Sequence, residues 1–248
     1  MDPYSFPPFA AVLSVADAAV SWLATLFQSA LPEGAAVSVA IVLATLVVRA
    51  LLIPVGLSTA RAQVARARLA PKLRALQRRH GEDRALLARK TQELYAAEGV
   101  SPFAGMLPAL VQLPVVSVVY GVFTRSTVAG HANALLAHTV LGSPLSASFA
   151  QLLAAGAFGQ LVVPLALLVM IAGIAIASRE LALRAARAAD AGAPAPTRVT
   201  RILSWLPLLT VVFAAIAPIG ASVYLAVSMA WTSVERTLAQ RHYLAARA

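Results

Sequence analysis

Cysteine is absent from this chain of 248 residues, and charged residues make up only 12% of it. Without cysteine the chain has no disulfide bonds, thiol catalysis or cysteine metal sites. Soluble domains carry about 25% charged and 45–50% apolar residues. Here 60% of the residues are apolar and the mean hydropathy is +0.79. The composition therefore excludes a soluble enzyme and predicts an integral membrane protein.

The usual signatures of nucleotide, metal and proton chemistry are also missing. The sequence has no Walker-type glycine-rich loop, and its apolar segments hold no paired carboxylates that would couple transport to protons. They hold no serine–histidine or zinc constellation either. The four histidines, at His80, His131, His138 and His242, do not show metal-ligand spacing. We therefore expect no catalytic residue, no metal site and no cofactor.

One charged residue stands inside an apolar run. Arg49 is the only charge between Ala35 and Leu57, a run that exceeds the roughly 20 residues of a membrane-spanning helix. A guanidinium in hydrocarbon costs from about 3 to more than 10 kcal/mol, and arginine does not deprotonate in proteins. A structural role would need a buried acid, and the expected spans offer none in their interior, since Glu180 lies at a span end and Glu235 at the last cytoplasmic boundary. We therefore predict that Arg49 faces water or a polar cavity and has a function.

The other basic residues predict the orientation in the membrane. Eighteen of the 20 lysines and arginines fall in three blocks, at 61–90, 179–201 and 236–247. Positive residues are retained on the cytoplasmic side of the membrane. This predicts a multi-pass protein of the bacterial inner membrane with its N-terminus outside and its C-terminus inside, in contact with anionic lipids. The basic blocks lack interleaved aromatic residues, so we expect no direct nucleic-acid recognition.

These observations predict one all-α membrane domain with five transmembrane helices. The spans are expected at 35–58, 102–126, 160–178, 202–217 and 218–236. The connecting parts are an outer-face segment 1–34, a cytoplasmic helical hairpin 59–101, an outer loop 127–159, a cytoplasmic loop 179–201 and a cytoplasmic tail 237–248.

The first segment has the pattern of a helix lying in the outer interface. Its polar residues recur at spacings of three and four, which places them on one helical stripe; they are Ser14, Asp17, Ser21, Thr25 and Gln28. Interfacial helices carry such a stripe beside an apolar face. A sixth span with a weakly polar face is the alternative.

The hairpin 59–101 is expected to contain two amphipathic helices. Leucines recur at helical spacing on both arms, namely Leu69, Leu73, Leu76, Leu87 and Leu94. Antiparallel pairing would bury these leucines and leave the arginines in water. Asp83 is a candidate N-cap for the second helix and Gly99 is expected to end it. The basic residues form either a solvated surface or a landing site for a polypeptide or a ribosome.

Three motifs carry a resemblance to a known family. The first is the stretch 94–123, with a tyrosine, a glycine, Gly-x-Leu-Pro and Gln-x-Pro, here Tyr95, Gly99, Gly105 to Pro108 and Gln112 to Pro114. The second is Thr-x3-Arg, here Thr45 and Arg49. The third is a Pro-x-Gly turn before Tyr-x3-Ser, here Pro218, Gly220, Tyr224 and Ser228. These motifs occur in a consistent order along residues 10–244. By them the chain resembles the YidC/Oxa/Alb family of membrane protein insertases.

The resemblance implies a function as well as a fold. It implies five helices around a hydrophilic groove open to the cytoplasm and to lipid, and a protein that is not an enzyme. Its partners would be nascent membrane proteins and lipid, with the ribosome and a Sec translocon as further candidates. The groove residues implied are Thr45, Arg49, Gln112, Tyr224, Ser228 and Trp231. Met106 and Met229 stand where the family often has cysteine and asparagine.

Alternatives remain open for the residues and for the function. Thr45 would also fit a hydrogen bond to its own helix, Gln112 a bond between helices, and Tyr224 and Trp231 packing or interface positions. A folding or assembly chaperone without insertion activity is a second function. A small anion transporter is a third, although the internal repeat that it predicts is not visible.

Overall fold

The structure is a computed structural model that describes residues 6–99, 101, 107–128, 130–189 and 204–245. Long helices dominate these residues. The helices are α1 (Pro7–Phe27), α2 (Glu33–Leu51), α3 (Ile53–His80), α4 (Arg84–Ala97), α5 (Leu107–Thr124), α6 (Phe149–Ala154), α7 (Val162–Ala189), α9 (Leu209–Ile216) and α10 (Ile219–Ala245). Shorter elements are the strands β1 (Thr127–Val128), β2 (His131–Ala132), β3 (Thr139–Val140) and β4 (Ser143–Pro144), and the 3-10 turns η2 (Ala134–Ala137), η3 (Phe158–Gln160) and η4 (Leu206–Leu208). Pro102, Gly105, Met106 and most of the loop 179–201 lie outside the described residues.

Among the described helices, three are long and apolar enough to cross a membrane: Pro7–Phe27, Gly34–Leu51 and Val162–Arg184. Gln112–Thr124 and Leu206–Ile216 are apolar but shorter. The chain is thus a mostly helical membrane protein, while the arrangement of five helices around a groove stays a prediction. Because α1 qualifies by length and composition, both interpretations of the first segment, interfacial helix and extra span, also stay predictions.

Apolar side chains lie on two faces of α1. Leu13, Val20 and Ala24 are buried in the core, whereas Val15 and Trp22 are 68% and 62% exposed. Large exposed apolar residues at helical spacing are typical of a surface covered by lipid. The outward face of α1 is thus apolar, and this suits contact with the membrane in either interpretation.

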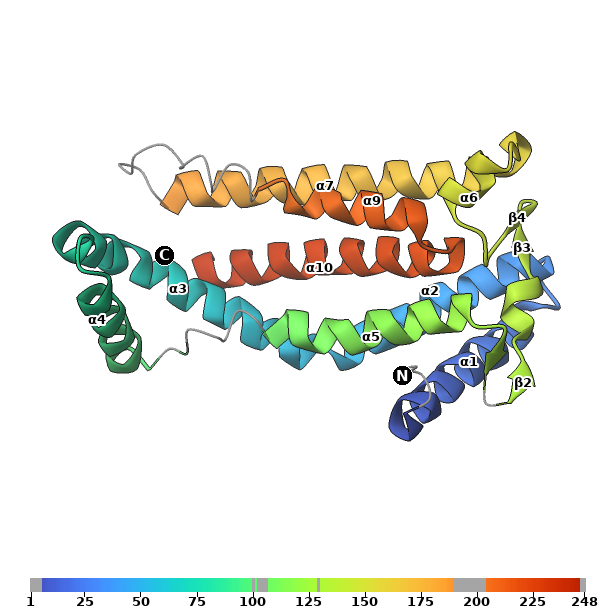
Figure 1. The fold of residues 1–248 in the computed structure, drawn as a ribbon, viewed down its shortest axis with the longest axis horizontal. Helices are drawn as coiled ribbons and strands as arrows, with labels where there is room; N and C mark the ends of the chain where they lie inside the picture. The colour runs from blue at the N-terminus through green and yellow to red at the C-terminus, as the bar shows by residue number, and fades with distance from the viewer. Residues whose placement is uncertain (1–5, 100, 102–106, 129, 190–203, 246–248) are drawn as a thin grey trace. The chain divides into compact units, whose positions relative to one another are not determined.

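The chain divides into two compact units. We call Met1–Ala50 with Pro114–Ser233 the bundle unit, and Leu51–Leu113 with Val234–Ala248 the hairpin unit. One hydrophobic core runs through the bundle unit and joins α1, α2, α5, the outer loop, α7, α9 and α10. Figure 1 shows α7, α9 and α10 drawn along one another, with β3, β4 and α6 near the start of α10 and β2 beside α1.

The loop 127–159 holds the first turn of α10. The backbone N–H of Ile219 donates to the carbonyl of Ala147 at 2.8 Å, and that of Gly220 donates to the carbonyl of Leu145 at 3.0 Å. These are among the N–H groups that a helix start leaves without an intrahelical partner. The short strands of this loop, which the sequence analysis did not predict, thus belong to a segment that fixes where α10 begins.

Asn133 connects the same loop to the end of α5. Its Nδ2 donates to the carbonyls of Val122 at 2.6 Å and Arg125 at 2.9 Å, and its Oδ1 accepts from the N–H of Leu135 at 3.1 Å. The side chain is buried. It therefore supplies donors to two carbonyls that the C-terminus of a helix leaves unpaired.

Gly220 lies directly against an aromatic ring, and this contact supports a stability prediction. A Cβ at position 220 would overlap the ring of Phe123, which is itself buried. We expect Gly220→Ala to lower the free energy of unfolding by about 1–3 kcal/mol because it overpacks the core. Thermal unfolding in detergent would measure this change. Gly173→Ala is the matched control, since its Cβ would enter open space; an equal loss in both variants would contradict the packing argument.

Arg179 of α7 contacts the segment that leads into α9. Its guanidinium lies 4.1 Å from the centre of the Trp205 ring, and its Nε donates to Oγ of Ser204 at 3.2 Å. Its Nη1 forms an ion pair with Glu180 at 2.7 Å. Arginine over indole is a favourable cation–π geometry, so this cluster attaches η4 to α7.

The helix is broken inside the first expected span, 35–58. α2 ends at Leu51 and α3 begins at Ile53, while the bounds of the span stay a prediction. The break at Leu52 has φ −89° and ψ 0°. Pro54 explains it, because proline has no N–H to donate to the fourth preceding carbonyl and disfavours the helical conformation before it.

The hairpin unit contains α3 and α4 packed against each other. The predicted N-cap is confirmed, since Oδ1 of Asp83 accepts from the N–H of Leu86 at 3.0 Å. Gly99, at φ +63°, follows the end of α4, also as predicted. Lys72 of α3 pairs with Glu98 at that end. Hydrogen bonds from Lys90 and then Arg89 lower the pKa of Glu93 on the exposed surface of α4.

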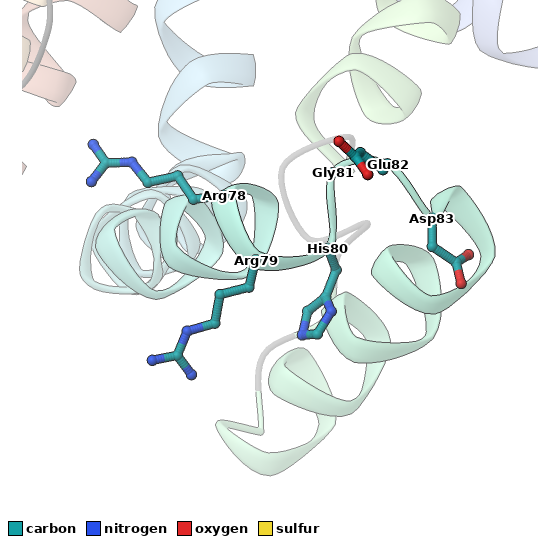
Figure 2. A pocket seen from close by; sticks show the side chains of 6 residues that line it. All are labelled: Arg78, Arg79, His80, Gly81, Glu82 and Asp83. Carbon is teal, nitrogen blue, oxygen red and sulfur yellow. The ribbon is translucent and has the colours of Figure 1, made fainter.

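A recess marks the tip of the hairpin (Figure 2). Figure 2 shows two arginine side chains extending from the end of α3 and two acidic side chains on the turn that follows. The residues that line the recess are Arg78, Arg79, His80, Gly81, Glu82 and Asp83. None of them is a predicted groove residue.

Candidate functional site

Arg49 lies near the end of α2, in the bundle unit, and is half-buried. Its Nε is buried and has no hydrogen-bond partner in the described part of the chain. Buried polar groups in folded proteins are almost always paired, with protein groups, water or a ligand. In a charged side chain on an apolar helix, this unpaired nitrogen marks a position that water or a polar ligand would occupy.

Thr45 lies one helical turn before Arg49 and is 3% exposed. Its Oγ1 donates to the carbonyl of Ile41 at 2.6 Å. This is the bond to its own helix that the alternative interpretation predicted. The hydroxyl proton is thus engaged within α2, while the oxygen still has the capacity to accept a bond.

Three predicted residues lie on α10 at spacings of four and three, which places Tyr224, Ser228 and Trp231 on one face of the helix. Tyr224 and Ser228 are each 3% exposed, and Trp231 is half-buried. Oγ of Ser228 and Nε1 of Trp231 are both buried, and neither has a hydrogen-bond partner within the described residues. This face of α10 therefore carries unpaired polar atoms one turn apart.

The predicted residues fall into two groups in the structure. Five of them belong to the bundle unit, where α2 and α10 contribute to the same hydrophobic core. Gln112 lies in the part of α5 that belongs to the hairpin unit and is half-buried there. Gln112 therefore belongs to a different unit from the other five predicted residues.

Several buried polar atoms without a hydrogen-bond partner belong to residues that the sequence singled out. Five such side-chain atoms occur among the described residues, and three of them belong to Arg49, Ser228 and Trp231. The other two are Oδ1 of Asp17 on α1 and Oε1 of Glu235 on α10. Sequence analysis placed Glu235 at a span boundary and gave it no role. The sequence feature that could have pointed to Glu235 is that it is the single acidic residue of α10.

Chemically, the site offers donors more than acceptors. Arginine and indole nitrogens donate only, while a serine hydroxyl donates and accepts. A polar ligand that carries carboxylates or free carbonyls would satisfy them.

Comparison with known proteins decides the family. The family model described as 60Kd inner membrane protein matches residues 29–246. The chain belongs to this family. The family is the one that the sequence motifs indicated, the YidC/Oxa/Alb insertases. Family membership and the apolar helices make the chain a multi-pass protein of the bacterial inner membrane; the orientation of its ends stays a prediction.

Relatives within the family share moderate identity. A protein named membrane protein insertase YidC from Shewanella sp. (strain ANA-3) is 36% identical over 117 residues, which are 47% of this chain and 21% of the relative. Proteins of the same name from Aeromonas hydrophila and Cellvibrio japonicus are 35% and 39% identical over 111 and 93 residues. These alignments cover 45% and 38% of this chain and 20% and 17% of the relatives. The chain thus aligns with about a fifth of the length of these relatives.

Proposed function

We propose that this chain is a membrane protein insertase. It moves the short polar or acidic outer flanks of nascent membrane proteins across the bilayer and releases their apolar segments into lipid. The observation that carries the proposal is the buried, unpaired Nε of Arg49 on an apolar helix. The relatives named as insertases support the same function.

The proposed mechanism follows from solvation. A polar flank loses its hydration when it enters hydrocarbon, and a hydrated cavity shortens the distance over which this loss applies. Arg49 attracts an acidic flank more strongly there than in bulk water, because screening by solvent is weaker. Ser228 and Trp231 add hydrogen-bonding groups along α10. The apolar segment then enters lipid, driven by roughly 25 cal/mol for each Å² of apolar surface removed from water.

The finer details belong to the same proposal. The cavity is a groove open to the cytoplasm and to lipid, lined by Arg49, Thr45, Gln112 and the face of α10 with Tyr224, Ser228 and Trp231. The N-terminus is outside and the C-terminus inside, as the three basic blocks indicate. The partners are nascent membrane proteins and lipid, and the ribosome and a Sec translocon are candidates for delivery.

Reconstitution tests the function directly. Purified protein in liposomes should insert a single-span client that has a short acidic outer flank, as measured by protection of that flank from added protease. Empty liposomes give the background. Protection that never exceeds this background would contradict insertion. An increase in the folded yield of a client that is already inserted would instead support the chaperone.

Photocrosslinking tests the path of the client. A photoreactive residue in place of Trp231 should capture the client, since its indole nitrogen is buried on the polar face of α10. Ala230, the exposed neighbour about 100° around the helix, is the control position. We expect at least severalfold more adduct at position 231. Equal adducts at the two positions would show that the face with Tyr224, Ser228 and Trp231 is not the path.

A further inference from the structure

Glu235 is a partly buried acid that the mechanism above does not use. It lies on α10 and belongs to the hairpin unit. Its Oε1 is buried, and no donor from the described residues reaches it. The residue as a whole is half-buried, so part of its side chain remains accessible. The neighbouring Arg236 is exposed, and consecutive residues on a helix do not face each other.

The carboxylate of Glu235 rests on a glycine of α3. A Cβ at Gly56 would overlap Oε1 and lie 2.5 Å from the carboxyl carbon. Any other residue at position 56 would therefore occupy the place of the carboxylate. A buried carboxylate oxygen without a donor is costly. Among the described residues, this oxygen has no cationic or hydrogen-bond-donating partner.

Client proteins carry cationic side chains that can pair with a carboxylate. Membrane proteins have an excess of lysine and arginine in the cytoplasmic segments that flank their spans. Glu235 stands immediately before the basic block 236–247, which the charge distribution assigns to the cytoplasmic side. We propose that the Glu235 carboxylate, seated on Gly56, binds a lysine or arginine in the cytoplasmic flank of the client. This inference rests on the proposed insertase function and adds a second recognition site to it.

Binding at Glu235 would contribute to the orientation of the client. An acidic outer flank is attracted to Arg49, whereas a basic inner flank is retained by Glu235. An ion pair at a partly buried position is stronger than one at the surface, because water screens it less. Clients with a basic inner flank should therefore insert more efficiently than clients with a neutral flank.

The test uses three clients in liposomes that contain the protein. They share one span and one outer flank, and their inner flank carries two lysines, two glutamines or two glutamates. With the wild-type protein, we expect the lysine client to insert best. Glu235→Gln should reduce insertion of the lysine client about tenfold, the size expected for a hydrogen bond to a charged group, and leave the glutamine client unchanged. Glu235→Lys should favour the glutamate client.

A second variant displaces the Glu235 carboxylate from its position against Gly56 without changing the charge. Gly56→Ala places a methyl group where the carboxylate lies and should also remove the preference for the lysine client. Gly173→Ala, a helical glycine beside open space, should keep it. A carbodiimide, which joins a carboxylate to an amine, should link Glu235 to a lysine of the flank in the wild-type protein, as identified by peptide mass spectrometry.

The outcomes separate this inference from the function on which it rests. Insertion by the wild-type protein that Glu235→Gln leaves unchanged for all three clients would overturn the inference alone. The same holds if Glu235→Gln reduces all three clients equally, because the carboxylate would then act on the fold or on lipid. If the wild-type protein inserts no client above the level of empty liposomes, the proposed insertase function itself is contradicted.

Discussion

Arg49→Ala is expected to reduce insertion of a client with an acidic outer flank by about tenfold or more, because hydrogen bonds to charged groups contribute about 1.5–3 kcal/mol. The guanidinium is the only charge in the apolar run 35–57, and its Nε has no hydrogen-bond partner among the described residues. Protease protection of the outer flank in proteoliposomes measures the effect. A client with a neutral outer flank should be affected much less.

Two further variants sharpen this prediction. Arg49→Lys should retain much of the activity if charge alone matters, whereas a loss as large as that of alanine would indicate that the planar guanidinium is required. Arg78→Ala removes an exposed arginine at the tip of the hairpin and controls for the general loss of positive charge. Wild-type insertion of every client by Arg49→Ala would contradict the mechanism.

Asn133→Ala is expected to have the largest effect on stability. It removes both donors to the carbonyls of Val122 and Arg125, and the acceptor for the N–H of Leu135. Each buried group left unpaired costs about 1–3 kcal/mol, so the free energy of unfolding should fall by roughly 3 kcal/mol or more. Denaturant unfolding in detergent micelles measures this change.

The control for Asn133 lies in the same segment. Thr127→Ala alters an exposed side chain of β1 and should change the free energy of unfolding by less than about 0.5 kcal/mol, as surface substitutions usually do. A small effect of Asn133→Ala would contradict this argument. It would indicate that water reaches the end of α5 and replaces the lost hydrogen bonds.

Local chemistry explains which predictions from the sequence were confirmed. Asp83 caps α4 and Gly99 follows its end, because a cap depends on the preferences of one or two residues and on nearby backbone groups. The unusual position of Arg49 was visible because the surrounding run contains no other charge. The motif order indicated the family, and the match over residues 29–246 confirmed it.

Other features depend on contacts between distant segments. The donor role of Asn133 depends on α5 ending beside a loop residue eleven positions after Val122. The start of α10 depends on carbonyls more than 70 residues earlier in the chain. The two-residue strands are too short to leave a periodic pattern. The break between α2 and α3 is local by contrast, because Pro54 by itself disfavours a continuous helix there.

The sequence by itself determined that the protein belongs in a membrane, which family it resembles and that Arg49 is out of place among apolar residues. Composition and the spacing of charges decide these points, because transfer from water to lipid depends on the residues themselves. Only the tertiary structure decided which polar atoms lack partners. Thr45 donates a hydrogen bond within its own helix, whereas Ser228, Trp231 and Glu235 each have a buried atom with no hydrogen-bond partner among the described residues. Pairing depends on what other segments bring within about 3 Å, and a sequence does not specify those distances.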